Sequence, residues 1–372
     1  MAKITIIMHD LRGGGAEQMM VRLANELIEQ AYTVDIILVG AGGINKPLLD
    51  SKVGLYELGC KRTLTSLIPL RKALKCSAPD AVLSVLTHIN VISFFACLSL
   101  NWLTKLSVSE RNAYSLDKLV NQSKLMRLVY ALAPLTYRLL PKPVIAVSQG
   151  VADDLIEHSM VRKVDTVVAP NPVITLQSKA QALQPAQHPW LADKSVPTLI
   201  AVGRLSQQKG FDYLISAFAE VRSALNCRLV IFGEGELKSE LQQQVAALGL
   251  DQAVDFAGYS NNILAEMKAA DLYVLSSRFE GSPNTLVEAM SVGTKVVAFD
   301  CPHGPKEILQ DGKVAPLVPM GNVDALSQAI LDGIDKPSNY DAACAPYHAR
   351  ASANCYAKLL LSDDLLIQAV GE

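Results

Sequence analysis

The chain has 372 residues, of which half are hydrophobic and 19% charged, so it is globular and too long for one ordinary core. Its formal net charge of −2 excludes a strongly basic nucleic-acid binder, and no nucleic acid is expected as a partner. Seven cysteines lie singly, without a C-x-x-C pair, which indicates neither a disulfide framework nor a metal site and fits a reducing cytoplasm.

Short apolar runs rich in Val and Ile alternate with helix-length stretches through the first half of the chain. The run KITIIM at 3–8 is predicted to be the first strand, because it is too short for the apolar region of a signal peptide. The strands expected after it are TVDIILVG at 33–40, AVLSVL at 81–86, KLSVS at 105–109 and VIAVS at 144–148. This rhythm predicts a parallel sheet with helices on both faces.

The most apolar long window of the sequence is Val85–Leu103, which contains His88, Asn90 and Asn101. A window of this length could be a buried helix or a membrane span. Because polar groups are costly in lipid, the sequence favours a buried helix that follows a strand.

The strand rhythm pauses around Asn171, where Pro170 and Pro172 disfavour a helix and stiffen the connection. It restarts with TLIAVG at 198–203, RLVIFG at 228–233, AVDFAG at 253–258, DLYVLSS at 271–277 and TKVVAFD at 294–300. We therefore predict two tandem doubly wound α/β domains, residues 1–172 and residues 173–348.

Charge divides unevenly between the two halves. Residues 1–172 carry 19 Lys and Arg against 14 Asp and Glu, an excess of +5, which leaves −7 for the remainder. Two segments of the first half, Lys61–Lys75 and Lys118–Lys142, each hold five basic residues and no acidic residue. Such segments either lie on an anionic membrane surface or bury an apolar face in the core and solvate their charges.

The loop after the first strand contains a glycine run. Ligands of open α/β sheets bind at the carboxyl ends of the strands, and Gly14 and Gly15 would let the backbone approach a phosphate beside a helix N-terminus. Gln18 stands where a dinucleotide fingerprint requires glycine, so that motif is excluded. A plain tight turn explains the run equally well.

Two cations follow the first strand of the second half. Arg204 and Lys209 lie five residues apart, at the start of a predicted helix. A guanidinium fork and an ammonium point charge suit a diphosphate. The alternative is a solvated loop with two ordinary surface charges.

The stretch SRFEGSPNTLVEAM at 277–290 joins a predicted strand to a predicted helix. The helix should begin near Pro283–Thr285, and Ser282 suits its N-cap and Pro283 its first position. The loop would then present backbone N–H groups and a helix N-terminus to a ligand.

Two carboxylates flank this anion-binding loop. Repulsion excludes Glu288 from a phosphate, but its carboxylate suits the two hydroxyls of a ribose, and Glu280 suits the hydroxyls of a second sugar. The backbone of Gly281, Ser282 and Asn284 would hold anionic oxygens between them. In the alternative, both acids only stabilise the helix N-terminus.

These motifs together resemble the retaining family 4 glycosyltransferases of the GT-B fold. The resemblance runs in order over residues 4–330 and rests on GGAE at 14–17, NPV at 171–173, GRLSQQKG at 203–210 and Glu280-x7-Glu288. SRFEGSPNTLVEAM followed by DCPHGPKEIL is similar to bacterial enzymes that build lipopolysaccharide, O-antigen and related surface glycans. The resemblance implies two Rossmann-like domains with a cleft between them, and a C-terminal helix at 349–372 that returns to the first domain.

The resemblance also implies roles for the candidate residues. Arg204 and Lys209 would bind the donor diphosphate, and Glu288 the nucleotide ribose. Glu280 would contact the donor sugar, and the amides of Gly14–Gly15 would approach the phosphate from the other domain.

Two positions match the family less firmly. His88 corresponds by position to a histidine near the transferred sugar, and a hydrogen-bonded core histidine is an equal alternative. Ser282 stands where relatives often carry a larger apolar residue, which puts the shape of the sugar pocket in doubt.

The implied reaction moves a hexosyl or N-acetylhexosaminyl group from a nucleotide-sugar, expected to be a UDP-sugar, to a hydroxyl of a glycan or a polyprenyl- or lipid-linked glycan. No metal cofactor is expected, since cations and amides can stabilise the leaving diphosphate and no D-x-D pair is present. A sugar-nucleotide epimerase, a PLP-dependent phosphorylase and an inactive sugar-nucleotide-binding subunit of the same fold are alternatives. The implied location is the cytoplasm, with peripheral contact at the cytoplasmic face of the inner membrane.

Overall fold

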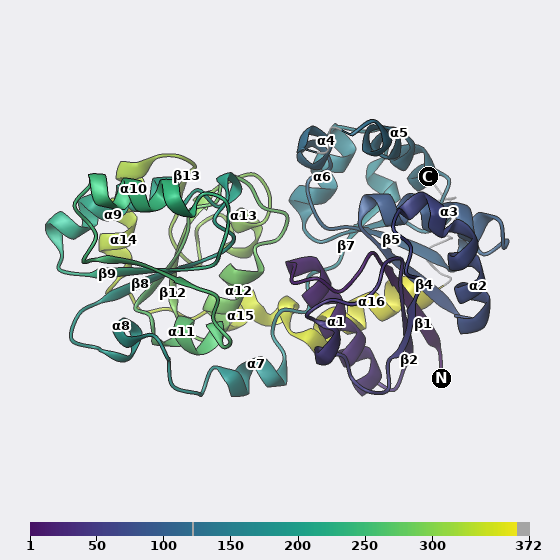
Figure 1. Cartoon of the computed structure of the whole chain (residues 1–372), viewed down its shortest axis with the longest axis horizontal. Helices are drawn as coiled ribbons and strands as arrows, with labels where there is room; N and C mark the ends of the chain where they lie inside the picture. Colours follow the sequence, from purple (N-terminus) through teal and green to yellow (C-terminus); the bar gives the residue numbers. More distant parts are fainter. Residues whose placement is uncertain (121–122, 363–372) are drawn as a thin grey trace. The chain divides into compact units, whose positions relative to one another are not determined.

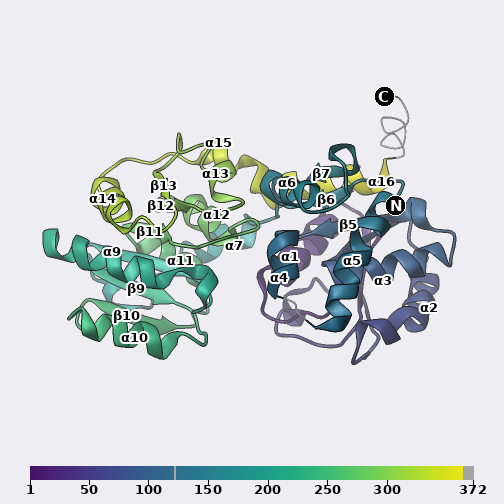
Figure 2. The same ribbon diagram turned by 90° about the horizontal axis from the view of Figure 1, so that it is seen from above.

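The computed structural model describes residues 1–120 and 123–362, which form two compact units (Figures 1 and 2). Unit 1 consists of Met1–Val173 and the described residues from Tyr347 on, and unit 2 is Ile174–Pro346. Residues 121–122 of the second basic segment and residues 363–372 of the predicted C-terminal helix lie outside the described residues.

Unit 1 is built on a seven-stranded parallel sheet with the strand order β3-β2-β1-β4-β5-β6-β7. Its strands are β1 (Lys3–Met8), β2 (Thr33–Leu38), β3 (Gly54–Glu57), β4 (Ala81–Val85), β5 (Leu106–Glu110), β6 (Val144–Ala146) and β7 (Thr166–Val168). The five strands predicted in this half are confirmed. The sequence pattern missed the two edge strands of this sheet, β3 and β7.

Helices cover both faces of this sheet. They are α1 (Gly15–Glu29), α2 (Leu67–Ser77), α3 (Thr87–Leu98), α4 (Tyr114–Val120), α5 (Lys124–Arg138), α6 (Gln149–Glu157) and α16 (Ala349–Leu361). Helices α2, α3 and α5 lie side by side on one face, and α1 and α16 pack together on the other (Figures 1 and 2). The apolar window of the sequence is the largely buried α3. Among the described helices none is both long and apolar enough to span a membrane.

Helix α16 is fastened to unit 1 by buried polar groups. The guanidinium of Arg111, which directly follows β5, donates to Asn171 Oδ1 and, at 2.8 Å, to the hydroxyl of Tyr356 in α16. Ser352 Oγ donates to the carbonyl of Pro170 at 2.6 Å. The proline-flanked segment predicted between the domains and the last described helix are therefore held at the same place in unit 1.

Unit 2 has a six-stranded parallel sheet with the order β10-β9-β8-β11-β12-β13. Its strands are β8 (Thr198–Val202), β9 (Arg228–Phe232), β10 (Val254–Gly258), β11 (Leu272–Leu275), β12 (Lys295–Asp300) and β13 (Leu317–Pro319). The five predicted strands are confirmed. The edge strand β13 was missed because it has three residues and ends in a proline, which cannot donate to a ladder.

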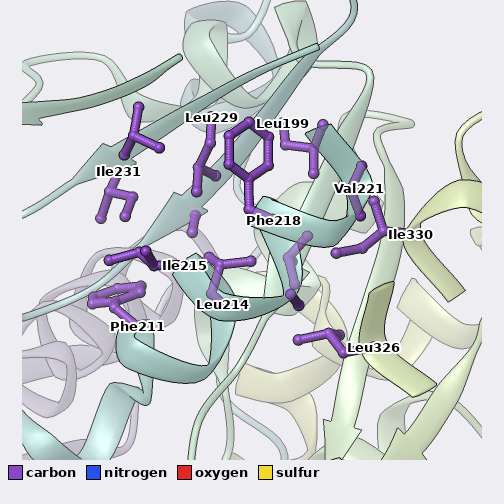
Figure 3. Packing of buried hydrophobic residues seen from close by; sticks show 14 of the residues in the cluster. Leu199, Phe211, Leu214, Ile215, Phe218, Val221, Leu229, Ile231, Leu326 and Ile330 are labelled. Carbon is purple, nitrogen blue, oxygen red and sulfur yellow. The ribbon is translucent and has the colours of Figure 1, made fainter. Parts of the chain in front are cut away.

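The core of unit 2 lies between its sheet and the helices that cover it. These are α7 (Leu176–Gln181), α8 (Pro189–Ala192), α9 (Phe211–Ala224), α10 (Lys238–Ala247), α11 (Ile263–Ala269), α12 (Asn284–Ser291), α13 (Pro305–Ile308), α14 (Val323–Gly333) and α15 (Asp341–Cys344). Figure 3 shows the ring of Phe218 in α9 between the strand residues Leu199 and Leu229, and Val221 of α9 beside Ile330 of α14. Each such buried side chain stabilises the fold by about 1.5–3 kcal/mol, which holds α9 and the loop before it against the sheet.

Candidate active site

The strand order of each sheet reverses beside its first strand. In unit 1, β1 lies next to β4, and in unit 2, β8 lies next to β11. The connections diverge at such a point and leave a crevice outside the carboxyl ends of the strands. The predicted residues follow these four strands: Gly14 and Gly15 after β1, His88 after β4, Arg204 and Lys209 after β8, and Glu280, Gly281, Ser282, Asn284 and Glu288 after β11.

An ion pair joins the two loops at the reversal point of unit 2. Lys209 Nζ lies 2.7 Å from Glu280 Oε1, and Ser277 Oγ donates to the same carboxylate oxygen at 2.6 Å. Glu280 is buried and Lys209 is largely buried, so their attraction is stronger than that of a surface pair. The sequence placed both residues at a donor site, but it did not predict that they contact each other.

Backbone and side-chain hydrogen bonds hold the same two loops together. The amide of Arg278 donates to the carbonyl of Gln208 at 2.7 Å, and the Gln208 side chain donates to the carbonyl of Phe279 at 3.1 Å. Ser276 Oγ donates to the carbonyl of Lys209 at 2.9 Å. Lys209 and Glu280 therefore project from one cross-linked pair of loops.

Gly210 allows this close approach. Its φ of +60° is in the left-handed region, and it is the N-cap of α9. A Cβ at this position would lie 2.2 Å from the carbonyl oxygen of Ser276, so only glycine fits without a shift of the backbone.

A second ion pair, between Arg278 and Asp212, stabilises the loop after β11. Arg278 binds the carboxylate of Asp212 through two hydrogen bonds of 2.8 and 2.6 Å, and its guanidinium lies 4.2 Å from the ring centroid of Tyr213. Burial raises the pKa of Asp212, but the hydrogen bonds and charge of Arg278 outweigh burial and lower it overall. Sequence analysis missed this brace, because no motif pairs residues 66 positions apart.

The helix after Glu280 begins within the predicted range Pro283–Thr285, but its N-cap differs from the prediction. Helix α12 begins at Asn284 and Pro283 is its N-cap, so the assignment of Ser282 as N-cap and Pro283 as first helical residue is wrong. A Cβ on Gly304 would lie 2.4 Å from Pro283 Cδ, which shows how tightly the loop after β12 packs on this proline. Pro283 itself is not helical, with φ of −72° and ψ of 88°.

Glu288 and Arg204 differ in their surroundings. Glu288 is a buried residue of α12. Tyr273 lies nearby, and its pKa is raised by burial and by the charges of Glu280 and Glu288. The Tyr273 hydroxyl shares a 2.8 Å hydrogen bond with Thr285 Oγ1. Arg204 is exposed, and its side chain makes no hydrogen bond or ion pair within the part of the chain that the structure describes. The Arg204 guanidinium therefore has its donors available for an anion.

Among residues 1–120 and 123–362, no group of three His, Cys, Asp or Glu side chains is placed to hold a metal ion. The cations of the loop after β8 are the Arg204 guanidinium and the Lys209 ammonium. A guanidinium and an ammonium can both donate charge-assisted hydrogen bonds to an anion.

In unit 1 two histidines meet at the reversal point. The rings of His88 and His9 have centroids 5.5 Å apart in an edge-to-face arrangement. The pKa of His88 is lowered to about 4, mainly by burial and secondly by the charge of the neighbouring His9, so His88 is neutral near pH 7. His9 was not predicted, although a histidine directly after the first strand, in IIMHD, was a usable signal.

The glycine run is partly covered by an acid. Gly14 is the N-cap of α1, and a Cβ on it would lie 2.2 Å from a carboxylate oxygen of Glu17. Burial and the nearby Asp10 raise the pKa of Glu17, although its backbone hydrogen bond and two arginines oppose them. Because a carboxylate repels phosphate, an anion at Gly14 requires Glu17 to turn away or to take up a proton.

A buried carboxyl lies behind the first turn of α3. Glu110, the last residue of β5, accepts hydrogen bonds from the Tyr137 hydroxyl, from Thr87 Oγ1 at 3.0 Å and from Asn90 Nδ2 at 3.3 Å. Burial raises its pKa to about 7, although these hydrogen bonds oppose the shift. Since Thr87 precedes His88, Glu110 fixes the helical turn that presents the histidine. Sequence analysis missed Glu110.

We expect Glu110 to make the stability of the protein pH-dependent. Its ordinary pKa of 4.5 rises to about 7 in the folded state, so between these values the folded state binds more protons than the unfolded state. The free energy of unfolding should therefore fall by up to about 3 kcal/mol as pH rises through this window. Glu110→Gln should abolish that fall, as measured by urea unfolding at pH 4.5 and pH 8.

The exposed Glu29→Gln on α1 is the control for the substitution itself. If Glu110→Gln and wild type lose the same free energy of unfolding between the two pH values, Glu110 does not titrate in this window.

Two profiles of known protein families match the sequence: Glycosyltransferase Family 4 over residues 13–175 and Glycosyl transferases group 1 over residues 196–336. An uncharacterised glycosyltransferase of Haemophilus influenzae is 26% identical over 343 residues, which cover 90% of this chain and 90% of the relative. The N-acetylgalactosamine-N,N'-diacetylbacillosaminyl-diphospho-undecaprenol 4-alpha-N-acetylgalactosaminyltransferase of Campylobacter jejuni is 27% identical over 350 residues, or 89% of each chain.

Solved structures agree with this similarity at the level of the fold. The crystal structure of HepE from Anabaena in complex with UDP and glucose superposes with a TM-score of 0.73. The match covers 100% of this chain and 98% of that chain at 22% sequence identity. The likeness confirms the predicted architecture of two Rossmann-like sheets.

Proposed function

Because the chain belongs to the family 4 glycosyltransferases of the GT-B fold, we propose that it moves a hexosyl or N-acetylhexosaminyl group from a UDP-sugar to a hydroxyl of a lipid-linked glycan, with retention of configuration. The Campylobacter relative is a transferase of diphospho-undecaprenol-linked sugars, and the Anabaena structure contains UDP and glucose. These relatives support a UDP-sugar as donor and a lipid-linked saccharide as acceptor.

The observation that carries the proposal is the ion pair between Lys209 and Glu280 at the reversal point of unit 2. An ammonium beside a carboxylate offers a donor to phosphate oxygens and an acceptor to sugar hydroxyls within one small space. We assign Lys209 and Arg204 to the donor diphosphate, Glu280 to the transferred sugar and Glu288 to the ribose. The backbone of Gly281, Ser282 and Asn284 is assigned to anionic oxygens.

The chemical step breaks the bond between the anomeric carbon and the diphosphate while the acceptor hydroxyl attacks the same face of the sugar. Negative charge grows on the leaving phosphate, and each charge-assisted hydrogen bond to it contributes about 1.5–3 kcal/mol. The leaving phosphate takes up the proton of the acceptor hydroxyl. In unit 1 we assign the amides of Gly14 and Gly15 to the diphosphate and the neutral His88 to the transferred sugar.

The test is a thermal-shift screen of UDP-, GDP- and ADP-sugars, followed by measurement of nucleotide release with lipid-linked acceptors. A ligand at 100 times its Kd adds about 2.7 kcal/mol of stability, so UDP-sugars should raise Tm and the others should not. Turnover without an acceptor would indicate an epimerase. Binding without release against any acceptor would indicate an inactive subunit, and no shift with any sugar-nucleotide would overturn the proposal.

Substitution of the two glutamates should affect UDP binding and turnover separately. Glu288→Gln should weaken UDP binding, because it removes the acceptor for the ribose hydroxyls. Glu280→Gln should lower turnover without weakening UDP binding, because it frees the Lys209 ammonium from its carboxylate partner. Isothermal titration with UDP and steady-state rates measure the two effects. An equal loss of UDP affinity in both variants would show that the roles are wrongly divided.

A further inference from the structure

A few described residues other than glycine have a positive φ, and most of them end helices. Five lie within three residues after a helix, where a left-handed residue is an ordinary cap: Ala31, Ala78, Asn101, Gln310 and Asp311. The other two, Leu86 and His303, end no helix. Leu86 directly follows β4, and His303 lies three residues after β12. Both are thus at the carboxyl ends of strands, where open α/β sheets bind ligands.

The conformation of His303 is not explained by the fold. Its φ is +67°, a region that the Cβ of an L-residue disfavours. Glycine adopts this region freely, and the next residue of the turn, Gly304, has a φ of +92°. A glycine at position 303 would therefore form the turn at lower cost than histidine. Strained residues of this kind cluster at binding sites, where the side chain has a task other than folding.

Contacts on both sides of His303 fasten it to the loop of Glu280. The Glu280 amide donates to the carbonyl of Pro302 at 3.0 Å. A Cβ on Gly304 would lie 3.3 Å from the carbonyl oxygen of Gly281, so the two loops are in close contact there as well. His303 is half-buried, and part of its surface is open to solvent.

The segment that joins β12 to α13 also lies within the field of the Lys209–Glu280 ion pair (Figure 1). Burial, followed by the charge of Glu280, raises the pKa of the Cys301 thiol, and the charge of Lys209 opposes the shift. Cys301 is the first residue after β12, so both charges act at the beginning of the loop that carries His303.

We propose that His303 determines donor specificity by hydrogen-bonding a hydroxyl of the transferred hexose. An imidazole can both donate and accept a hydrogen bond, as recognition of a hydroxyl requires. The strand order β8-β11-β12 places His303 on the far side of Glu280 from the loop of Lys209. Because Lys209 is assigned to the diphosphate and Glu280 to the sugar, His303 lies on the sugar side. This inference rests on the proposed function.

The experiment compares the affinity of the full chain for UDP with that for UDP-glucose, UDP-galactose and their N-acetylhexosamine counterparts. Wild type should bind one of these UDP-sugars most tightly. In His303→Ala and His303→Gly, the Kd for that UDP-sugar should rise about five- to tenfold, the effect of one lost hydrogen bond. The Kd for UDP should change less than twofold, and the preference between the two C4 epimers should narrow. Isothermal titration measures each Kd.

Urea unfolding separates this role from a structural one. His303→Ala keeps the strained backbone and should unfold at the wild-type urea concentration, whereas His303→Gly relieves the strain and should unfold at the same or a higher concentration. The matched control is Gln310→Gly, because Gln310 is exposed and has a φ of +51° in the turn after α13. It should bind UDP and every UDP-sugar as wild type does.

The proposal is overturned if either His303 variant keeps the wild-type Kd for the preferred UDP-sugar, or if His303→Gly unfolds at a lower urea concentration. It is also overturned if the affinity for UDP falls as much as that for the UDP-sugar, since His303 would then contact the nucleotide. Equal wild-type affinities for the UDP-sugars would likewise exclude it. If wild type binds none of them, the proposed function fails, and this inference fails with it.

Discussion

Replacement of Lys209 by alanine should lower kcat/KM by about 30- to 900-fold, which corresponds to about 2–4 kcal/mol of lost transition-state stabilisation. The substitution removes a charged donor that we assign to the leaving diphosphate. It also leaves the buried carboxylate of Glu280, 2.7 Å away in the wild type, without its counter-ion. Steady-state kinetics with a UDP-sugar, together with urea unfolding, separates the catalytic effect from the effect on stability.

Two further variants make this result interpretable. Lys238→Ala is the control, since Lys238 forms only an exposed ion pair of 3.3 Å with Glu234 and should change kcat/KM less than twofold. The double variant Lys209→Ala, Glu280→Gln removes the unpaired carboxylate and should recover stability without recovering turnover. A wild-type kcat/KM in Lys209→Ala would exclude this lysine from the site.

Replacement of Gly210 by alanine should lower the free energy of unfolding by about 3 kcal/mol or more and abolish UDP binding. The left-handed φ of +60° costs an alanine about 1 kcal/mol. The new Cβ would lie 2.2 Å from the Ser276 carbonyl, so the backbone must move as well. That movement separates the loop of Lys209 from the loop of Glu280.

Gly249→Ala is the matched control. Gly249 has a similar φ of +68°, but no atom lies within 4 Å of the Cβ that alanine would add. This variant should lose only about 1 kcal/mol and bind UDP as wild type does. Urea unfolding and titration with UDP measure the two effects. If both variants lose the same free energy of unfolding and the same affinity for UDP, the left-handed backbone conformation, and not the contact with Ser276, explains the effect of Gly210→Ala.

The repeating pattern of the sheets could be predicted from the sequence because parallel strands buried on both faces are continuous Val- and Ile-rich runs. KITIIM and TKVVAFD, which become β1 and β12, are of this kind. The strand β3, GLYE, carries a weakly apolar pattern at a sheet edge, and β13 owes its assignment to pairing with β12. In edge strands of this length, pairing with the adjacent strand determines the extended conformation, so the local sequence does not indicate a strand.

The candidate site was predictable as a set of positions but not as a set of contacts. Arg204, Lys209 and Glu280 were predicted because each follows a strand whose carboxyl end was expected at a ligand site. The pairing of Lys209 with Glu280 joins residues 71 positions apart, and the sequence alone does not show which cation meets which acid. Glu110 was missed because a glutamate at the end of a strand is ordinarily solvated, and only tertiary packing buries it.

The fastening of α16 to unit 1 has a consequence for the order in which the protein folds. Proteins are made from the N-terminus, and domains generally fold as they emerge from the ribosome. Here unit 2 is encoded entirely within Ile174–Pro346, whereas unit 1 needs Tyr356 for the buried guanidinium of Arg111. The half that is synthesised first is therefore completed after unit 2, and until α16 has been synthesised the face of α1 that it covers stays open to chaperones.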